Sequence, residues 1–216
     1  MTDAPRSFAT RLLAGIATIV IAGGCAQPAY EPMARWDRDL CVRRAVAVHT
    51  PWDADVQRVL GQLHGRSGPW SRQPLPAIVV VTGPPMTRPG HFADGWVCGP
   101  TIVLHANAVA EAARSADRDR LLATIVAHEL AHLVLGHGTS ARDPVQLEFE
   151  ADALGAYFFE KGGFDCDWWV ARSRSLASRS QQYAARERGI IAARYDAVQS
   201  GCALAKSGGE APLEPR

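Results

Sequence analysis

Residues 117–135 read DRDRLLATIVAHELAHLVL and form the strongest helical pattern in the chain. They contain the pattern H-E-x-x-H at 128–132. An α-helix advances about 100° per residue, so His128 and His132 lie about 40° apart on one face, where both imidazoles can reach one metal ion. Glu129 lies beside them, where its carboxylate can accept a proton from a water that the metal activates. The pattern therefore predicts a catalytic metal site on this helix.

A second acidic motif follows on the next predicted helix. A catalytic zinc site needs a third protein ligand and leaves one position open for water. The motif E-F-E-A-D at 148–152 places Glu148 and Asp152 four residues apart, so one carboxylate can bind the metal while the other orients a metal-bound histidine. The helix is expected over 144–161, with Asp143 as its N-cap and glycines after its end. Its small residues allow a close approach to the first helix: Ala151, Gly155 and Ala156.

Two other residues near the motifs are weaker ligand candidates. Some zinc proteases take a third histidine six residues after the second, and His137 is displaced from that position by one residue. We keep His137 as an alternative ligand, or else as a loop or cleft-lining residue. Glu150 points about 200° away from Glu148 on the helix, which disfavours it as a ligand.

The two motifs together resemble those of a known enzyme family. H-E-L-A-H at 128–132 and E-F-E-A-D-A-L-G at 148–155 resemble the HtpX-like zinc metallopeptidases, a gluzincin family whose signature is H-E-x-x-H followed by E-x-x-A-D on a later helix. The resemblance covers residues 77–162 and implies one zinc ion per chain. It implies His128, His132 and Glu148 as the zinc ligands, with Glu129 as the catalytic acid/base. It also implies that Asp152 orients a ligand.

The chain departs from that family in two respects. The 15 residues between His132 and Glu148 form a short gap, and the membrane-spanning segments of the integral members are absent. The short gap and the sequence L-G-H-G at 135–138 are similar to ImmA/IrrE-type peptidases, a smaller gluzincin group. Both groups imply the same ligands.

Apolar periodicity and turn residues predict the rest of the fold. The expected elements are helices over 37–49 and 51–63, strands over 77–82 and 96–105, and one long helix or two shorter ones over 168–200. The resemblance to the family implies an α+β, zincin-like metallopeptidase domain, mostly helical, with a small sheet whose edge strand at Thr101–Leu104 precedes the active-site helix. An extended substrate would pair with that edge. Loops are expected at 65–76, 83–95 and 164–167.

The N-terminus has the layout of a secretory signal peptide. Arginines precede an uncharged run of 11 residues at 12–22, which is short for a bilayer span. Ala22-Gly23-Gly24-Cys25 resembles a bacterial lipobox, which predicts that Cys25 is lipidated. The expected organisation is a signal peptide at 1–24, a tether at 25–36, a single domain at 37–204 and a disordered tail at 205–216. The chain is then anchored by lipid in the bacterial cell envelope, facing the periplasm from the outer membrane; simple secretion and an uncleaved anchor are the alternatives.

Cysteine usage agrees with export. Four cysteines remain after Cys25, and they predict two disulfides among three possible connectivities, with four buried thiols as the alternative. They are Cys41, Cys98, Cys166 and Cys202.

Composition bounds the function. The 23 basic and 22 acidic residues give a net charge of +1, which argues against a nucleic-acid partner, and 47% hydrophobic residues argue against a disordered chain. We expect a zinc-dependent endopeptidase acting on extended or misfolded polypeptides of the envelope. The alternatives are a non-catalytic zinc-binding lipoprotein and a zinc hydrolase of peptidoglycan peptides. The candidates for an oxyanion donor are His137, Tyr157, Tyr183 and Arg194.

Overall fold

The computed structural model describes residues 46–82, 94–179 and 185–211. Within these ranges lie four strands and six α-helices, so the α+β class with a mostly helical content is confirmed. The strands are β1 (Val46–Ala47), β2 (Ala77–Thr82), β3 (Gly95–Cys98) and β4 (Thr101–His105). The α-helices are α3 (Asp53–Gly65), α4 (Ala106–Arg114), α5 (Arg118–Val134), α6 (Pro144–Lys161), α7 (Cys166–Arg179) and α8 (Ala185–Lys206). Two 3₁₀ helices are η2 (Gly68–Arg72) and η3 (His137–Thr139).

The sheet has the strand order β1-β2-β4-β3, with β2 parallel to β4 and β3 antiparallel to β4. The prediction that Thr101–Leu104 is the edge strand is therefore wrong, because β4 lies inside the sheet and β3 lies at its edge. A turn at Gly99-Pro100 splits the strand predicted over 96–105 into a hairpin, and β3 folds back along the outer side of β4.

The helix predicted over 37–49 is also wrong in its described part. Val46 and Ala47 form β1 and pair antiparallel with β2, and the Val48 amide donates to the Val80 carbonyl at 2.9 Å. The backbone of this segment is thus satisfied by the sheet, and valine suits an extended chain as well as a helix. The remainder of that segment, the signal peptide, Cys25 and the tether lie outside the described residues.

The other predicted elements differ mainly at their ends. The helix predicted from residue 51 begins at Asp53, and the loop predicted at 65–76 contains the 3₁₀ helix η2. Helix α4, which directly follows β4, was not predicted. The segment at 168–200 is two helices, α7 and α8. Helix α8 continues to Lys206 and Ala205 is buried, so a disordered tail that starts at 205 is wrong, because apolar packing extends the helix. Residues 212–216 lie outside the described residues.

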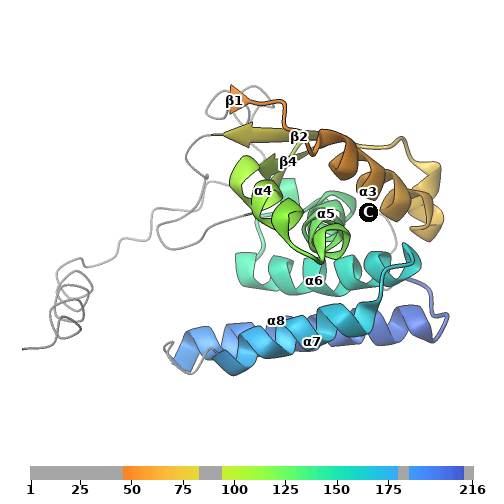
Figure 1. Cartoon of the computed structure of the whole chain (residues 1–216). Helices are drawn as coiled ribbons and strands as arrows, with labels where there is room; N and C mark the ends of the chain where they lie inside the picture. The colour runs from red at the N-terminus through yellow and green to blue at the C-terminus, as the bar shows by residue number, and fades with distance from the viewer. Residues whose placement is uncertain (1–45, 83–93, 180–184, 212–216) are drawn as a thin grey trace, which may run out of the picture. The chain divides into compact units, whose positions relative to one another are not determined.

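Helix α5 lies at the centre of the described fold (Figure 1). The sheet covers one side of it, α3 and α4 pack beside it, and α6 packs against its other side, with α8 and α7 beyond α6. Its core-facing side chains, such as Leu122, Val126 and Leu130, are almost fully buried. The H-E-x-x-H motif therefore sits on a helix that packing holds on several sides. None of the described helices combines the length and apolar character needed to cross a bilayer.

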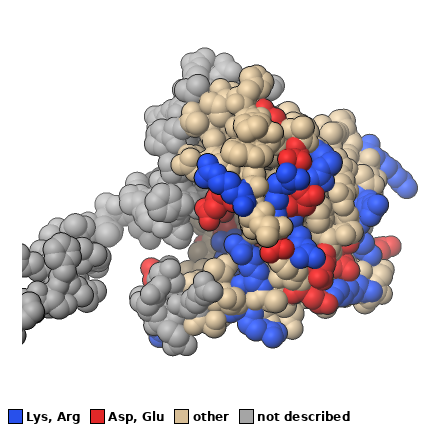
Figure 2. Space-filling model, in the orientation of Figure 1, with Lys and Arg blue, Asp and Glu red and all other residues tan. Residues whose placement is uncertain are grey.

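The face drawn in Figure 2 carries charges of both signs side by side. Several exposed charges of the described residues pair, as Arg58 does with Asp119 at 2.9 Å and Arg120 with Asp117 at 3.1 Å. Exposed pairs of this kind each contribute no more than about 1 kcal/mol. The packed core around α5 accordingly dominates the stability of the fold.

One disulfide joins the two C-terminal helices. Cys166 at the start of α7 is bonded to Cys202 in α8, with 5.8 Å between their Cα atoms. Cys98 is also disulfide-bonded, and Cys41 lies outside the described residues. The disulfide fixes α7 against α8, which in turn packs on α6.

Helices α5 and α6 approach closely at Gly155, as the small residues predict. A Cβ atom added to Gly155 would lie 3.1 Å from the carbonyl oxygen of Ala127 and 3.2 Å from the Cα of His128. These are backbone atoms of α5, which cannot rotate away. The absence of a side chain at Gly155 therefore sets the distance between the two helices that carry the motifs.

We expect Gly155→Val to lower the free energy of unfolding by about 1–3 kcal/mol, because the larger side chain overpacks the contact between α5 and α6. Urea denaturation followed by circular dichroism measures the change. The matched control is Gly189→Val on α8, where an added Cβ would have no heavy atom within 4 Å. Equal effects of the two substitutions would contradict the close approach at Gly155.

Candidate metal centre

The three predicted ligands come together between α5 and α6. The Nε2 atoms of His128 and His132 lie 3.0 Å apart. One oxygen of Glu148 lies 3.3 Å from the Nε2 of His128, and the other lies 3.4 Å from the Nε2 of His132. One donor atom from each residue lies within 4.8 Å of the others, so the group could hold a metal ion.

The donor set fits a divalent zinc ion. Two imidazole nitrogens and one carboxylate oxygen are a common catalytic zinc set and leave a fourth position for water or substrate. Bonds of about 2.0–2.1 Å at tetrahedral angles place neighbouring donors about 3.3 Å apart. The two Nε2 atoms, 3.0 Å apart, are close to that value, and each of them has one of the two Glu148 oxygens at 3.3 or 3.4 Å.

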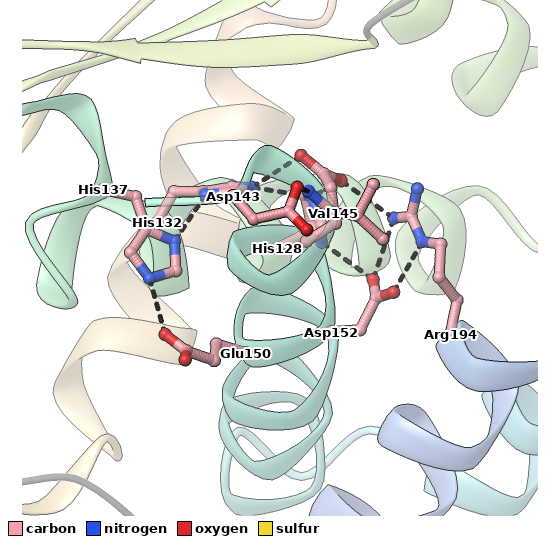
Figure 3. Close-up of polar contacts among 9 residues, drawn as sticks. His128, His132, His137, Asp143, Val145, Glu150, Asp152 and Arg194 are labelled. Atoms are coloured by element: carbon pink, nitrogen blue, oxygen red, sulfur yellow. Dashed lines mark hydrogen bonds and ion pairs between the residues drawn. The ribbon is translucent and has the colours of Figure 1, made fainter. Parts of the chain in front are cut away.

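Asp152 contacts the Nδ1 edge of His128, away from the donor atoms, and Arg194 contacts Asp152 (Figure 3). The Nδ1 of His128 lies 2.9 Å from an oxygen of Asp152, which is only 4% exposed. Arg194 on α8 donates to both oxygens of that carboxylate, from Nε at 2.6 Å and from Nη2 at 3.0 Å. With its Nδ1 donating to Asp152, His128 keeps Nε2 free for a metal. The predicted role of Asp152 therefore has the required geometry.

Without a metal, an ionised Glu148 and a protonated His128 face each other in the site. Burial lowers the pKa of His128, but hydrogen bonds with Asp152 and Glu148 outweigh burial and raise the pKa to about 10. Burial opposes ionisation of Glu148, yet its hydrogen bonds with both histidines hold its pKa well below the usual range. Burial lowers the pKa of His132. At neutral pH a cation entering the site therefore meets an ionised Glu148 and must displace a proton from His128.

Glu129 is buried beside the ligands and against the edge strand. Only 5% of it is exposed, and a Cβ added to Gly95 of β3 would lie 2.9 Å from its Cγ. Burial raises the pKa of Glu129 to about 7. The negative charges of Glu148 and Asp94 add to this rise, while the positive charge on His128 opposes it. A carboxyl group whose pKa lies near neutrality can both accept and return a proton.

His137 and Glu150 hold His132 from its other side (Figure 3). Gly136 adopts a left-handed conformation with φ of 67° and turns the chain after α5, which brings His137 back toward His132. The two Nδ1 atoms lie 2.8 Å apart, and the Nε2 of His137 lies 3.1 Å from an oxygen of Glu150. Glu150 also accepts two contacts from Arg142, one of them at 2.9 Å.

This arrangement separates His137 and Glu150 from the ligand group. His137 contacts the Nδ1 edge of His132, whereas the donor group lies at the Nε2 edge, so the alternative of His137 as the third ligand is not supported. Burial and the neighbouring His132 lower the pKa of His137 to about 4, so it is neutral. Glu150 contacts His137 and Arg142 and has no contact with the ligand histidines, in agreement with the helical geometry that disfavours it as a ligand.

The four candidates for an oxyanion donor are now distinguished by position. The hydroxyl of Tyr157 donates to the carbonyl of Gly209 at 3.3 Å, and Tyr183 lies outside the described residues. His137 faces the far edge of His132. The Nη2 of Arg194 lies 3.3 Å from a carboxylate oxygen of Glu148. His137 and Arg194 thus both contact a ligand residue, and Arg194 is the candidate that lies beside the carboxylate of Glu148.

Sequence reasoning missed how these supporting residues are connected. Arg194 meets Asp152 across 42 residues, and no periodic pattern relates the two positions. Arg142 and Glu150 are eight residues apart, on either side of a helix start. The one local signal was the glycine before His137, which turns the chain at the end of α5.

Comparisons with protein-family models, with curated proteins and with solved structures gave no match to this chain. What the site can do therefore follows from its own donor atoms, burial and charges.

Proposed function

We propose that the chain is a zinc-dependent endopeptidase that hydrolyses peptide bonds in extended or misfolded polypeptides of the bacterial cell envelope. One observation carries the proposal: His128, His132 and Glu148 present converging donor atoms, and the buried carboxyl group of Glu129 lies next to them. This combination matches what metal-assisted hydrolysis requires, namely a three-residue metal site with an open position and an adjacent base.

Glu129 and Arg194 have different roles in the proposed reaction, proton transfer and charge stabilisation. Zinc, when bound, supplies the Lewis acidity that activates water and polarises the scissile carbonyl. The carboxylate of Glu129 accepts a proton from the attacking water and returns it to the nitrogen of the leaving amine. The guanidinium of Arg194 stabilises the negative charge that develops on the carbonyl oxygen, because it is held beside Glu148 and stays positively charged.

The edge strand suggests how a substrate lies. Among the described residues β3 pairs with β4 alone, and Gly95 at its start packs against Glu129. An extended peptide that adds to β3 by main-chain hydrogen bonds would run past the base and the metal ligands. Main-chain pairing gives little sequence preference, which suits unfolded polypeptides as substrates.

The proposed location rests on the N-terminal sequence. The signal-like segment and Cys25 favour a lipid-anchored chain that faces the periplasm, on the outer membrane. The disulfide between Cys166 and Cys202 agrees with export to an oxidising compartment.

The proposal predicts that the zinc-loaded chain degrades unfolded casein. Cleavage should stop with 1,10-phenanthroline and return when zinc is added back, as measured by mass spectrometry of the released peptides. Purified peptidoglycan, incubated in parallel, should release no fragments. Zinc binding without casein cleavage would favour the non-catalytic binding protein, and release of cell-wall peptides would favour the peptidoglycan hydrolase.

A further inference from the structure

We propose that His137, Glu150 and Arg142 form a positioning chain that fixes His132 for metal binding, separately from Asp152 and Arg194, which fix His128. The inference rests on the metal site of the proposed function, and it assigns a role to three residues outside the ligand set. It concerns the affinity and geometry of the metal rather than the reaction itself.

The order of protons along the chain follows from the contacts. A histidine that binds a metal through Nε2 carries its proton on Nδ1. The Nδ1 of His132 therefore donates to the Nδ1 of His137, 2.8 Å away, which must be unprotonated. The remaining proton of His137 is then on Nε2, which donates to Glu150 at 3.1 Å. One arrangement of protons satisfies every contact.

The far end of the chain is anchored. Glu150 is on α6 and Arg142 precedes that helix, and the guanidinium contacts both carboxylate oxygens. A fork of this kind holds a carboxylate in one orientation. Because His137 belongs to η3, the chain of contacts ties the turn after α5 to α6. The ring of His132 is thereby fixed from outside its own helix.

The two ligand histidines are supported in different ways. His128 donates directly to the buried carboxylate of Asp152, whereas a neutral imidazole separates His132 from the carboxylate of Glu150. Both chains of contacts end in an arginine, Arg194 on one side and Arg142 on the other. This pattern indicates that both ligand rings are held in place before a metal binds.

The test compares two substitutions of His137. The side-chain oxygen of asparagine stands near the position of Nδ1 and can accept from His132, whereas leucine cannot accept a hydrogen bond. We expect His137→Leu to weaken zinc affinity about 10- to 100-fold. His137→Asn should stay within about threefold of the wild type. Zinc affinity is measured in the full chain by competition with a chromogenic chelator.

Further measurements separate positioning from a general loss of structure. The d–d absorption bands of the cobalt-loaded chain should change in His137→Leu and be restored in His137→Asn. If the leucine variant does not fold, Glu150→Ala serves as the test in its place, because it changes a partly exposed helical position. Glu150→Ala should also weaken zinc affinity. The control is His49→Leu, because the imidazole of His49 is fully exposed and its partner is Asp53.

The outcomes distinguish this inference from the proposed function. Wild-type zinc affinity in both His137→Leu and Glu150→Ala would overturn the positioning chain while leaving the peptidase proposal intact. Equal weakening in His137→Leu and His137→Asn would also overturn it. Weakening in His137→Leu with rescue in His137→Asn would support the chain even if no polypeptide were cleaved. A wild-type chain that binds no zinc would overturn both proposals.

Discussion

Replacing Glu129 by glutamine is expected to lower kcat/KM for an unfolded polypeptide by about 10²–10⁴-fold while zinc stays at about one ion per chain. Glutamine has nearly the same shape but cannot accept a proton from water. Glu129 is not among the donor atoms that converge on the metal site, so metal binding should survive. Initial rates of casein cleavage, together with zinc content by atomic emission, measure both effects on the same preparation.

The matched control for that substitution is Glu187→Gln, at an exposed position on α8. Its rate and zinc content should equal those of the wild type. If Glu129→Gln kept its metal and more than a tenth of the wild-type rate, another group would have to act as the base. If it lost its metal, Glu129 would belong to the ligand set.

Replacing Glu148 by alanine is expected to remove zinc and activity together. The substitution leaves two histidine ligands, and a catalytic zinc site needs three protein ligands. The side chain of Glu148 is 39% exposed and alanine favours a helix, so the fold should persist. Zinc per chain after dialysis should fall from about one to well below one-half. The metal-free chain should melt at a lower temperature, because Glu148 also pairs with His128, His132 and Arg194, but it should keep a cooperative thermal transition.

Glu187→Ala is the control for the loss of a glutamate, and it should retain zinc. Retention of zinc in Glu148→Ala would remove Glu148 from the ligand set and would make His137 the next residue to test. Unfolding of Glu148→Ala would be visible as a lost thermal transition, which separates it from a specific loss of metal.

The two pairs of candidate side chains were predictable because their geometry is local, while the resemblance distinguished the roles of Glu148 and Asp152. The spacing of His128 and His132, and of Glu148 and Asp152, fixes two pairs of side chains on two helical faces without any tertiary information. The start of α6 was equally local, since the carboxylate of Asp143 caps the helix and accepts from the Val145 amide. The close approach of the two helices followed from the missing side chain of Gly155.

What the sequence did not predict depends on contacts between distant segments. Val46 and Ala47 fitted the apolar spacing of the helix predicted over 37–49. In the structure they form a strand, because their backbone pairs with β2. The edge position of β3 depends on where the hairpin folds in the sheet. Arg194 meets Asp152 because α8 packs on α6, a contact that no spacing rule describes.

The most direct test of the metal centre is anomalous X-ray diffraction at the zinc absorption edge from crystals of the zinc-loaded chain. The account predicts one strong peak per chain, about 2.0–2.2 Å from the Nε2 atoms of His128 and His132 and from a carboxylate oxygen of Glu148. The Nδ1 atom of His128 should face Asp152, and the Nδ1 atom of His132 should face His137. A peak that lacks Glu148, a peak bonded to His137, or no peak at this site would contradict the account.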